Sequence, residues 1–537
     1  MNLNLPQLDL IIIVLYLVGM IVLGLYVSRH MRSTSAGYYL AGRTLRWPMV
    51  GAALFASNIS TIHLIGLAAS GYNEGLAWGN YEWMAVTTLI VLGLVFAPFY
   101  FRSKISTLPE FLEKRYNASS RVFLSFMGIM GALLVHIGLS LYAGAAIMEQ
   151  FFGLDVVTSI LIISVITAIY TIIGGLKAVV VTETIQTAML ILGAIIITGY
   201  AISALPDFGI HSYADLKAAA KPDQLSMLHT DNSKSLAWYA VLLGYPIMGI
   251  WYWCTDQTIV QRVLGAETEY DAQTGPLFAA LLKFLPVFII IFPGVIAYVI
   301  FSDKIGEQAN QALPVLITEL IPTGLKGLIS AGILAALMST IAAALHSSAT
   351  LVSLDLFKNL REKYGEKRQI LVGRISAVVV MLLAMLWSTQ GYRFSSIFEA
   401  NAIIVGSISP AITTVFVWGV FWRRGTGQAA VATFITGILM GALAVMSDIP
   451  VWGDKRFITD VLGIGPLLLA WWGFVICSSV YVIVSLLTPK PDPEIVNQLT
   501  WGKPWEVLSG KIKGWKDPRV LSVGLMIIFV LLYTLFR

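Results

Sequence analysis

The chain has 537 residues, of which 57% are hydrophobic and only 12% charged, and its formal net charge is +5. Soluble domains contain about 45–50% apolar and about 25% charged residues, so this composition excludes a disordered chain, a nucleic-acid-binding protein and an ordinary soluble enzyme. A small basic excess is typical of membrane proteins, whose cytoplasmic loops collect Lys and Arg. The two isolated cysteines, Cys254 and Cys477, provide neither a disulfide framework nor a metal site.

Fourteen stretches are long and apolar enough to be predicted as membrane spans, although polar residues in several of them leave about 12 to 15 spans open. A span needs about 20 apolar residues, and helices satisfy their own backbone groups in lipid. The apolar N-terminal run lacks a basic start and a cleavage site, so it is predicted to be a retained span rather than a signal peptide. The predicted spans are 8–28, 47–71, 78–101, 122–151, 155–173, 177–204, 236–258, 275–301, 325–352, 370–389, 395–422, 427–447, 462–487 and 518–536.

The loops between these spans alternate in charge. Odd-numbered loops are basic: the third, for example, follows Arg102, and the seventh carries Arg262. Even-numbered loops such as 206–235 and 302–324 are mixed or acidic. The excess of Lys and Arg predicts that odd loops are cytoplasmic and that both termini lie outside a plasma (inner) membrane.

Two predicted spans contain sequences that interrupt a helix. In the span 47–71, residues 56–63 read ASNISTIH, and Ser and Asn side chains compete for backbone hydrogen bonds. In the span 236–258, Pro246 and Gly249 lie near the middle, and proline removes one helical hydrogen bond. Interruptions at corresponding places in two halves indicate a transporter site between inverted repeats, although helix kinks without function are common.

This spacing predicts a five-plus-five repeat and the following organisation. The first 46 residues form an extra helix and a first cytoplasmic loop. The two repeats are 47–205 and 236–424, joined by an extracellular loop, 206–235. Three further helices occupy 425–537, with a cytoplasmic connector at 488–516.

Ionisable and hydroxyl-bearing residues inside the predicted spans are candidates for function, because a charge at the bilayer centre costs at least about 2.5–3.5 kcal/mol. These residues are Glu82, His136, Glu183, Lys283 and Glu399. They could instead reach the membrane surface from a helix end, or form a Glu–Lys pair that binds no substrate. Adjacent hydroxyls at Ser339 and Thr340 could serve only close helix packing; with carbonyls freed near Ala56 and Ile59 they could also hold an alkali ion.

Several stretches together resemble one known family. They are YYLAGRTLRWPMVGAALFASNISTIHLIGLAASG, STLPEFLEKRY, YTIIGGLKAVVVTETIQT, IWYWCTDQTIVQR, LMSTIAAALHSSATLVSLDLF and VFWRR. The chain resembles the sodium/solute symporters over nearly its whole length, and is most similar in motif to the sodium/glucose cotransporters. This resemblance implies an all-α polytopic membrane protein of about 14 helices. It also implies a five-plus-five inverted-repeat core like that of the leucine transporter, with one extra helix before it and three after it.

The resemblance also implies a sodium site. Backbone oxygens of Ala56, Ile59 and Ala336 and hydroxyls of Ser339 and Thr340 occupy the family's ligand positions. Members with a second sodium site use further hydroxyls and an Asp. Here those positions hold Ala342, Ala343 and Glu183, so we expect one sodium ion per cycle.

The substrate residues implied by the resemblance, with their neighbours, are Asn58, His63, Tyr81, Glu82, His136, Tyr252, Trp253, Lys283, Phe398 and Glu399. One position departs from the family: a sugar-binding Gln is replaced by Ala402. The neighbouring Asn401 lies about 100° further round a regular helix, so it would need an unwound or shifted helix to substitute.

The expected function is therefore sodium-coupled import of a monosaccharide by alternating access, with sodium as the co-transported ion and no enzymatic activity. A polyol such as inositol remains open as the substrate, as does a carboxylate or an amino acid. Two further alternatives are a sodium-independent uniporter and a membrane sensor. The expected partners are a small molecule, sodium and lipid, without nucleic acid.

Overall fold

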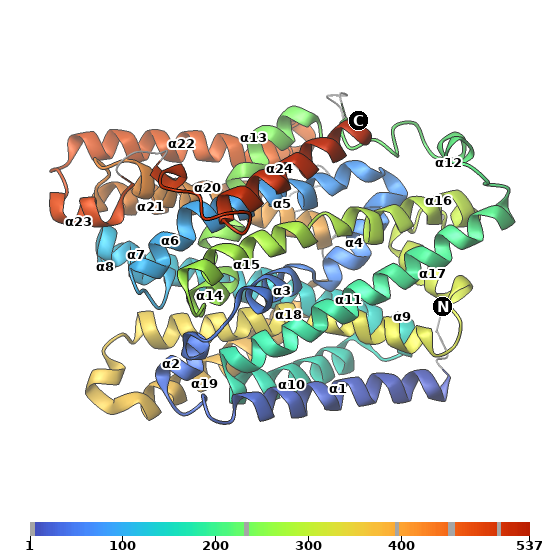
Figure 1. The fold of residues 1–537 in the computed structure, drawn as a ribbon, viewed down its shortest axis with the longest axis horizontal. Helices are drawn as coiled ribbons and strands as arrows, with labels where there is room; N and C mark the ends of the chain where they lie inside the picture. Colours follow the sequence, from blue (N-terminus) through green and yellow to red (C-terminus); the bar gives the residue numbers. More distant parts are fainter. Residues whose placement is uncertain (1–5, 230–235, 392–396, 449–456, 502–505) are drawn as a thin grey trace.

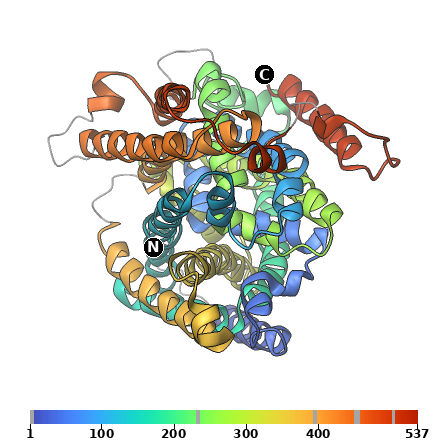
Figure 2. The ribbon, with the colours of Figure 1, turned by 90° about the vertical axis from the view of Figure 1, so that its left-hand side faces the viewer.

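The computed structural model describes residues 6–229, 236–391, 397–448, 457–501 and 506–537, with the backbone alone at 150–152, 360, 397–400 and 507. Within these residues all regular structure is helical, with two isolated bridges and no β-strand. The long helices run along one axis of the molecule (Figure 1). Seen along that axis, the C-terminal helices from α21 (Gly427–Asp448) to α24 (Pro518–Leu535) lie on the upper side of the bundle (Figure 2). The all-α prediction is confirmed.

Within the described residues, twelve helical segments are long and apolar enough to cross a membrane. A thirteenth is the bent pair α3 (Trp47–Asn58) and α4 (Thr61–Asn73). The remaining predicted span, 236–258, is helical but does not meet the same criterion, so the count of fourteen is not confirmed. The twelve are Gln7–Ser28 (α1), Leu76–Arg102 (η2, α5, η3 and α6), Ala118–Glu149 (α8, η4 and most of α9), Val156–Gly174 (α10), Leu176–Phe208 (α11 and η5), Glu269–Ile305 (α15, η7 and α16), Leu325–Leu356 (α18 and η9), Arg361–Ser388 (in α19), Asn401–Phe421 (in α20), Gly427–Asp448 (α21), Pro466–Leu487 (α22) and Pro518–Leu535 (α24).

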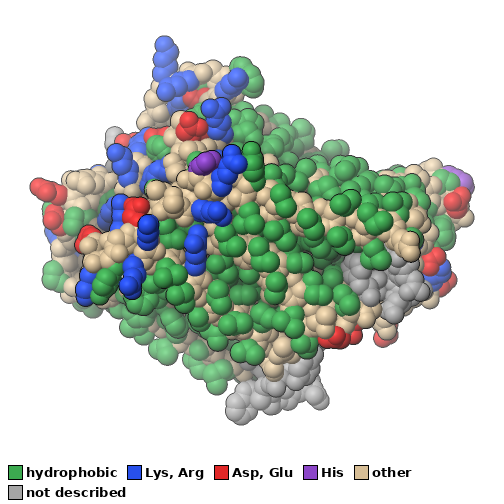
Figure 3. Space-filling model, turned by 90° about the horizontal axis from the view of Figure 1, so that it is seen from below, with side chains coloured by type: hydrophobic (Ala, Val, Ile, Leu, Met, Phe, Trp, Pro, Cys, Tyr) green, Lys and Arg blue, Asp and Glu red, His purple; other side chains and the backbone are tan. Residues whose placement is uncertain are grey.

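The outer helices expose apolar side chains, as contact with lipid requires. Helix α1 spans 22 residues, about 33 Å at 1.5 Å per residue, and Leu15 on it is 67% exposed. Figure 3 shows a broad hydrophobic surface, with Lys and Arg gathered at one end. The chain is therefore a multi-pass membrane protein.

The first predicted interruption is present. Helix α3 (Trp47–Asn58) and helix α4 (Thr61–Asn73) meet at 63°, and Ile59 has an extended backbone, φ −77° and ψ 95°. Ser60 caps α4 in a capping box with His63, which satisfies amides that a broken helix leaves free. The polar residues that weaken the helix therefore also restart it.

Both halves of this broken helix pack closely on one neighbouring helix pair, α15 (Glu269–Leu282) and α16 (Phe292–Ile305). A Cβ at Gly51 would lie 2.6 Å from the Gly275 carbonyl oxygen, and one at Gly294 would lie 2.0 Å from that of Ala68. Small residues allow such close approach of helices in membranes. Lys283, which follows α15, is thereby placed opposite the break.

The second interruption lies about ten residues beyond its predicted position. Pro246 and Gly249 lie within continuous helix α13 (Trp238–Gly249), which continues as a π-helical segment, η6 (Ile250–Thr255). The break is at Asp256, which has φ −84° and ψ 122° and caps the next helix, α14 (Gln257–Leu264). One missing proline hydrogen bond did not break α13, because neighbouring helices and local π-helical turns can compensate for it.

Candidate substrate and sodium sites

A central cavity lies beside the first break. Its empty volume is about 890 Å³, a figure that includes the open space at its mouth. All of the predicted substrate residues whose side chains are described line it, namely Asn58, His63, Tyr81, Glu82, His136, Tyr252, Trp253 and Lys283. Phe398 and Glu399 begin α20 (Ile397–Phe421), but their side chains lie outside the described residues, so their roles stay predictions.

A buried charge cluster forms one wall of this cavity. The Lys283 Nζ lies 2.5 Å from Glu82 Oε2 and also donates to Asn58 Oδ1. Both charged side chains are almost fully buried, at 1% and 2% exposed. The ammonium lies 5.4 Å from the centre of the Trp253 ring, within cation–π range. Glu82 and Lys283 thus pair with each other and also face the cavity, where their remaining hydrogen-bonding capacity is available to a ligand.

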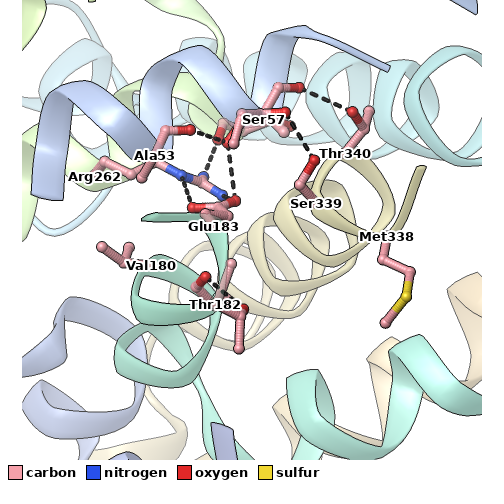
Figure 4. A network of polar contacts seen from close by, with 12 residues as sticks. Ala53, Ser57, Val180, Thr182, Glu183, Arg262, Met338, Ser339 and Thr340 are labelled. Atoms are coloured by element: carbon pink, nitrogen blue, oxygen red, sulfur yellow. Dashed lines mark hydrogen bonds and ion pairs between the residues drawn. The ribbon is translucent and has the colours of Figure 1, made fainter. Parts of the chain in front are cut away.

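The predicted sodium ligands come together where α3 ends against α18 (Leu325–Thr350). Ser339 Oγ lies 2.8 Å from the Ala56 carbonyl oxygen and 2.9 Å from that of Ala336. Thr340 Oγ1 lies 3.2 Å from the Ser57 carbonyl oxygen. Figure 4 shows these hydroxyls directed at the end of α3.

This arrangement fits an alkali cation, because several neutral oxygens converge between two helices. Oxygen ligands of this kind, from unwound backbone and hydroxyls, hold Na⁺ in transporters with broken helices. Ile59 leaves the helical path at the same point, although its carbonyl stays a prediction. Thr340 also lines the central cavity, so the cation position and the cavity share a wall.

Glu183 and Arg262 form a second buried ion pair, behind the sodium ligands. Arg262 Nη2 lies 2.6 Å from Glu183 Oε1, and both side chains are fully buried. The Ser57 hydroxyl donates to the same carboxylate oxygen at 2.9 Å, which joins the pair to the break (Figure 4). The sequence analysis placed Arg262 in the seventh loop, and this prediction was wrong. Because the second break is at Asp256, α14 places Arg262 inside the protein.

Asp256 is a site residue that the sequence analysis missed. One carboxylate oxygen accepts from the Thr258 amide at 2.8 Å, and the other lies 2.8 Å from His136 Nε2. Its position between an apolar helix and the next helix, which begins at Gln257, was an available signal, since Asp is a preferred N-cap residue. The contact ties the second broken helix to the helix that carries His136.

The wall formed by α20 also differs from expectation. Asn401 and Ala402 both line the cavity, and α20 is helical at both positions. An unwound helix is therefore not needed for Asn401 to reach the cavity. Other lining residues that the sequence analysis missed are Ser60, Ser140, Tyr245 and Val405.

Two helices broken inside an apolar bundle, with freed carbonyls beside a polar cavity, define a secondary active transporter. The family described as "Sodium:solute symporter family" matches residues 38–437. The chain belongs to the sodium:solute symporter family. It is a sodium-coupled symporter and not an enzyme, and Na⁺ is the co-transported ion.

Curated relatives cover most of this chain. It is 31% identical to "Sodium/glucose cotransporter 1" of Oryctolagus cuniculus, with 92% of this chain and 81% of the relative covered. It is 36% identical to "Sodium/mannose cotransporter SLC5A10" of Bos taurus, with 93% and 89% covered. It is 32% identical to "Sodium/myo-inositol cotransporter 2" of Homo sapiens, with 92% and 78% covered.

A solved structure shares the fold. The outward-open, substrate-bound structure of a Na⁺-coupled sialic acid symporter aligns with a TM-score of 0.75 at 20% identity, covering 91% of this chain and 99% of that one. The predicted inverted-repeat, leucine-transporter-like architecture is thereby confirmed.

Proposed function

We propose that this symporter imports a neutral polyhydroxylated solute, most simply a monosaccharide. The observation that carries this proposal is the Lys283–Glu82–Asn58 cluster beside Trp253 in the central cavity. A sugar hydroxyl both donates and accepts hydrogen bonds, and the cluster contains an ammonium donor, a carboxylate acceptor and an amide. The Trp253 ring suits the C–H face of a sugar. A site built for hydroxyls strongly rejects ligands that lack them.

The three curated relatives are named for glucose, mannose and myo-inositol, which are all neutral and rich in hydroxyls. Ala402 offers no hydrogen bond at a position where the family has a sugar-binding Gln, and Asn401 lines the cavity beside it. A polyol such as inositol is therefore the second candidate substrate. A carboxylate fits less well, because the only cation in the described cavity wall is already paired with Glu82.

Sodium is proposed to bind between the break and α18, with backbone oxygens of Ala56, Ile59 and Ala336 and hydroxyls of Ser339 and Thr340. By joining α3 to α18, the ion would order the wall that carries Asn58, so sodium and substrate would strengthen each other's binding. One sodium ion moving down 100 mV contributes about 2.3 kcal/mol, which corresponds to about 50-fold accumulation of an uncharged solute.

One sodium ion per cycle is proposed because the second site lacks its ligands. Ala342 and Ala343 carry no hydroxyl. The charge of Glu183 is already balanced by the guanidinium of Arg262.

We also propose an orientation in the plasma membrane. The basic end of the molecule (Figure 3) is placed on the cytoplasmic side. Helix α1 begins and α24 ends towards the opposite end (Figure 1), so both termini would lie outside.

The test is uptake by proteoliposomes under an inward sodium gradient, with potassium replacing sodium as the control. Labelled glucose, galactose, mannose and myo-inositol are compared with a labelled amino acid and a labelled carboxylate. Saturable, sodium-dependent uptake of at least one hydroxyl-rich solute is expected. Sodium-driven uptake of the carboxylate or amino acid alone would overturn the proposal.

The sodium site gives a separate prediction with a matched control. Ser339→Ala removes an oxygen that contacts the broken helix, so half-maximal transport should need at least about tenfold more sodium, or about 1.4 kcal/mol. Ser348→Ala is the control, because that buried hydroxyl on the same helix donates to its own helix, at the Ala344 carbonyl. Sodium titration of uptake distinguishes the two variants, and equal sodium dependence would remove Ser339 from the site.

A further inference from the structure

A second, smaller cavity lies beyond the second break. It has an empty volume of about 350 Å³ and lies between α8 (Ala118–Gly131), α14 and the start of α7 (Leu108–Arg115). Asp256 and Gln257 line it, as do Leu108 and Gly131. The second cavity thus lies between the break and α7, and α7 belongs to the predicted basic loop that follows Arg102. The substrate cavity lies on the other side of the break.

The His136–Asp256 pair stands between the two cavities. The imidazole lines the substrate cavity and the carboxylate lines the second one, yet the two groups are 2.8 Å apart and each is only 7% exposed. His136 lies in η4 (Ala132–Leu139), in the middle of the span that begins with α8. The pair therefore joins the second broken helix to a helix of the first repeat.

Thr255, Asp256 and Gln257 place polar side chains together in an otherwise mostly apolar lining of the second cavity. The Gln257 side chain accepts from the Leu108 amide through Oε1 at 2.8 Å. Its Nε2 is buried without a hydrogen-bond partner. A buried, unsatisfied donor is costly, so this amide is suited to a state in which water or a hydroxyl-bearing solute enters the cavity.

We propose that the His136–Asp256 pair is a latch that separates the substrate cavity from the second cavity, and that the solute passes through the second cavity after the latch opens. Opening leaves one oxygen of a buried carboxylate without its partner, while the other stays bonded to the Thr258 amide. This is unfavourable, so the latch stays closed until another group engages the imidazole. A solute in the substrate cavity can do this, because His136 is part of that cavity's wall. The proposal rests on sodium-coupled transport and not on the identity of the solute.

The same carboxylate caps α14, so the test must separate the latch from the cap. Asp256→Ser keeps a capping oxygen, since Ser and Asp are comparable N-caps, but its side chain is too short to reach His136. His136→Leu removes the partner and leaves the cap intact. His136→Gln keeps a donor that can still reach Asp256, and it serves as the conservative variant.

The readout is the labelling rate of a cysteine placed in the second cavity. Gly131→Cys suits this purpose, because a Cβ at Gly131 meets nothing within 4 Å. The purified full-length protein is labelled in detergent with a charged methanethiosulfonate reagent, without any solute. Variants that retain Gly131 measure the background from Cys254 and Cys477, both of which are buried. Gly193→Cys, buried on α11 in a separate cavity and with only ordinary Cβ contacts at 3.7 and 3.9 Å to Ile329, reports general loosening.

Asp256→Ser and His136→Leu should each raise the labelling rate at position 131 at least about tenfold, equivalent to about 1.4 kcal/mol. His136→Gln should leave it within about threefold of the parent, and labelling at position 193 should not change in any variant. The proposal is overturned if either latch variant labels at the parental rate, or if labelling at position 193 rises in parallel. If the protein takes up no hydroxyl-rich solute under a sodium gradient, the proposed substrate is overturned, but the cysteine-labelling result is not affected.

Discussion

Lys283→Met is expected to abolish sodium-driven solute uptake and to destabilise the protein by about 3–5 kcal/mol, the usual cost of leaving one partner of a buried ion pair alone. Glu82 is only 2% exposed, so its charge would be left largely desolvated without the ammonium. Asn58 loses its donor in the same change. Thermal unfolding in detergent measures the stability, and proteoliposome uptake measures the transport.

Two further variants show which part of the effect belongs to function. Glu82→Gln combined with Lys283→Met removes both charges, so stability should largely return while uptake remains absent. Lys304→Met breaks an exposed pair with Glu319, whose side chains are 50% and 28% exposed, and should cost at most about 1 kcal/mol. Normal uptake by Lys283→Met would exclude Lys283 from the substrate site.

Arg262→Met is expected to have the second large effect, again about 3–5 kcal/mol in stability. Glu183 would be left charged and fully buried, with the Ser57 hydroxyl as its remaining partner. Because the Ser57 carbonyl contacts Thr340, sodium activation of uptake should also weaken. Unfolding and sodium titration are measured on the same preparation.

The double variant Glu183→Gln and Arg262→Met serves as the matched control for this prediction. It removes both charges at once, so stability should largely recover if the loss in Arg262→Met comes from an uncompensated carboxylate. Wild-type stability of Arg262→Met alone would show that Glu183 tolerates the loss of its partner. In that case the pairing of Glu183 with Arg262 would no longer speak against a second sodium ion.

The first break shows what local sequence can predict. Residues 56–63 carry the side chains that end one helix and begin the next, so the position of the break depends on neighbours within one turn. The second break shows the limit. Pro246 is the strongest local breaker in its span, yet α13 continues past it and ends at Asp256. Asp256 caps α14 and also contacts His136, which is 120 residues away in sequence.

The residues of the cavity also divide into a part that local sequence predicts and a part that helix packing decides. Charged residues inside apolar spans already identified Glu82, Lys283, His136 and Glu183 as residues that need partners. Which residues become those partners depends on how the helices pack. Lys283 meets Asn58 because glycines let α3, α4, α15 and α16 approach closely, and Gly93 lets the span that carries Glu82 approach α15, since a Cβ there would lie 2.7 Å from the Gln273 carbonyl oxygen. Arg262 meets Glu183 because α14 turns back into the protein.

The sequence by itself determined that the chain lies in a membrane, that it belongs among sodium-coupled symporters, and which positions carry the first break. These properties depend on composition and on short segments. Only the tertiary structure decided the place of the second break, the pairing of Glu183 with Arg262 and the contact of Asp256 with His136. A buried charge needs a partner, but the bundle's packing determines which distant side chain reaches it.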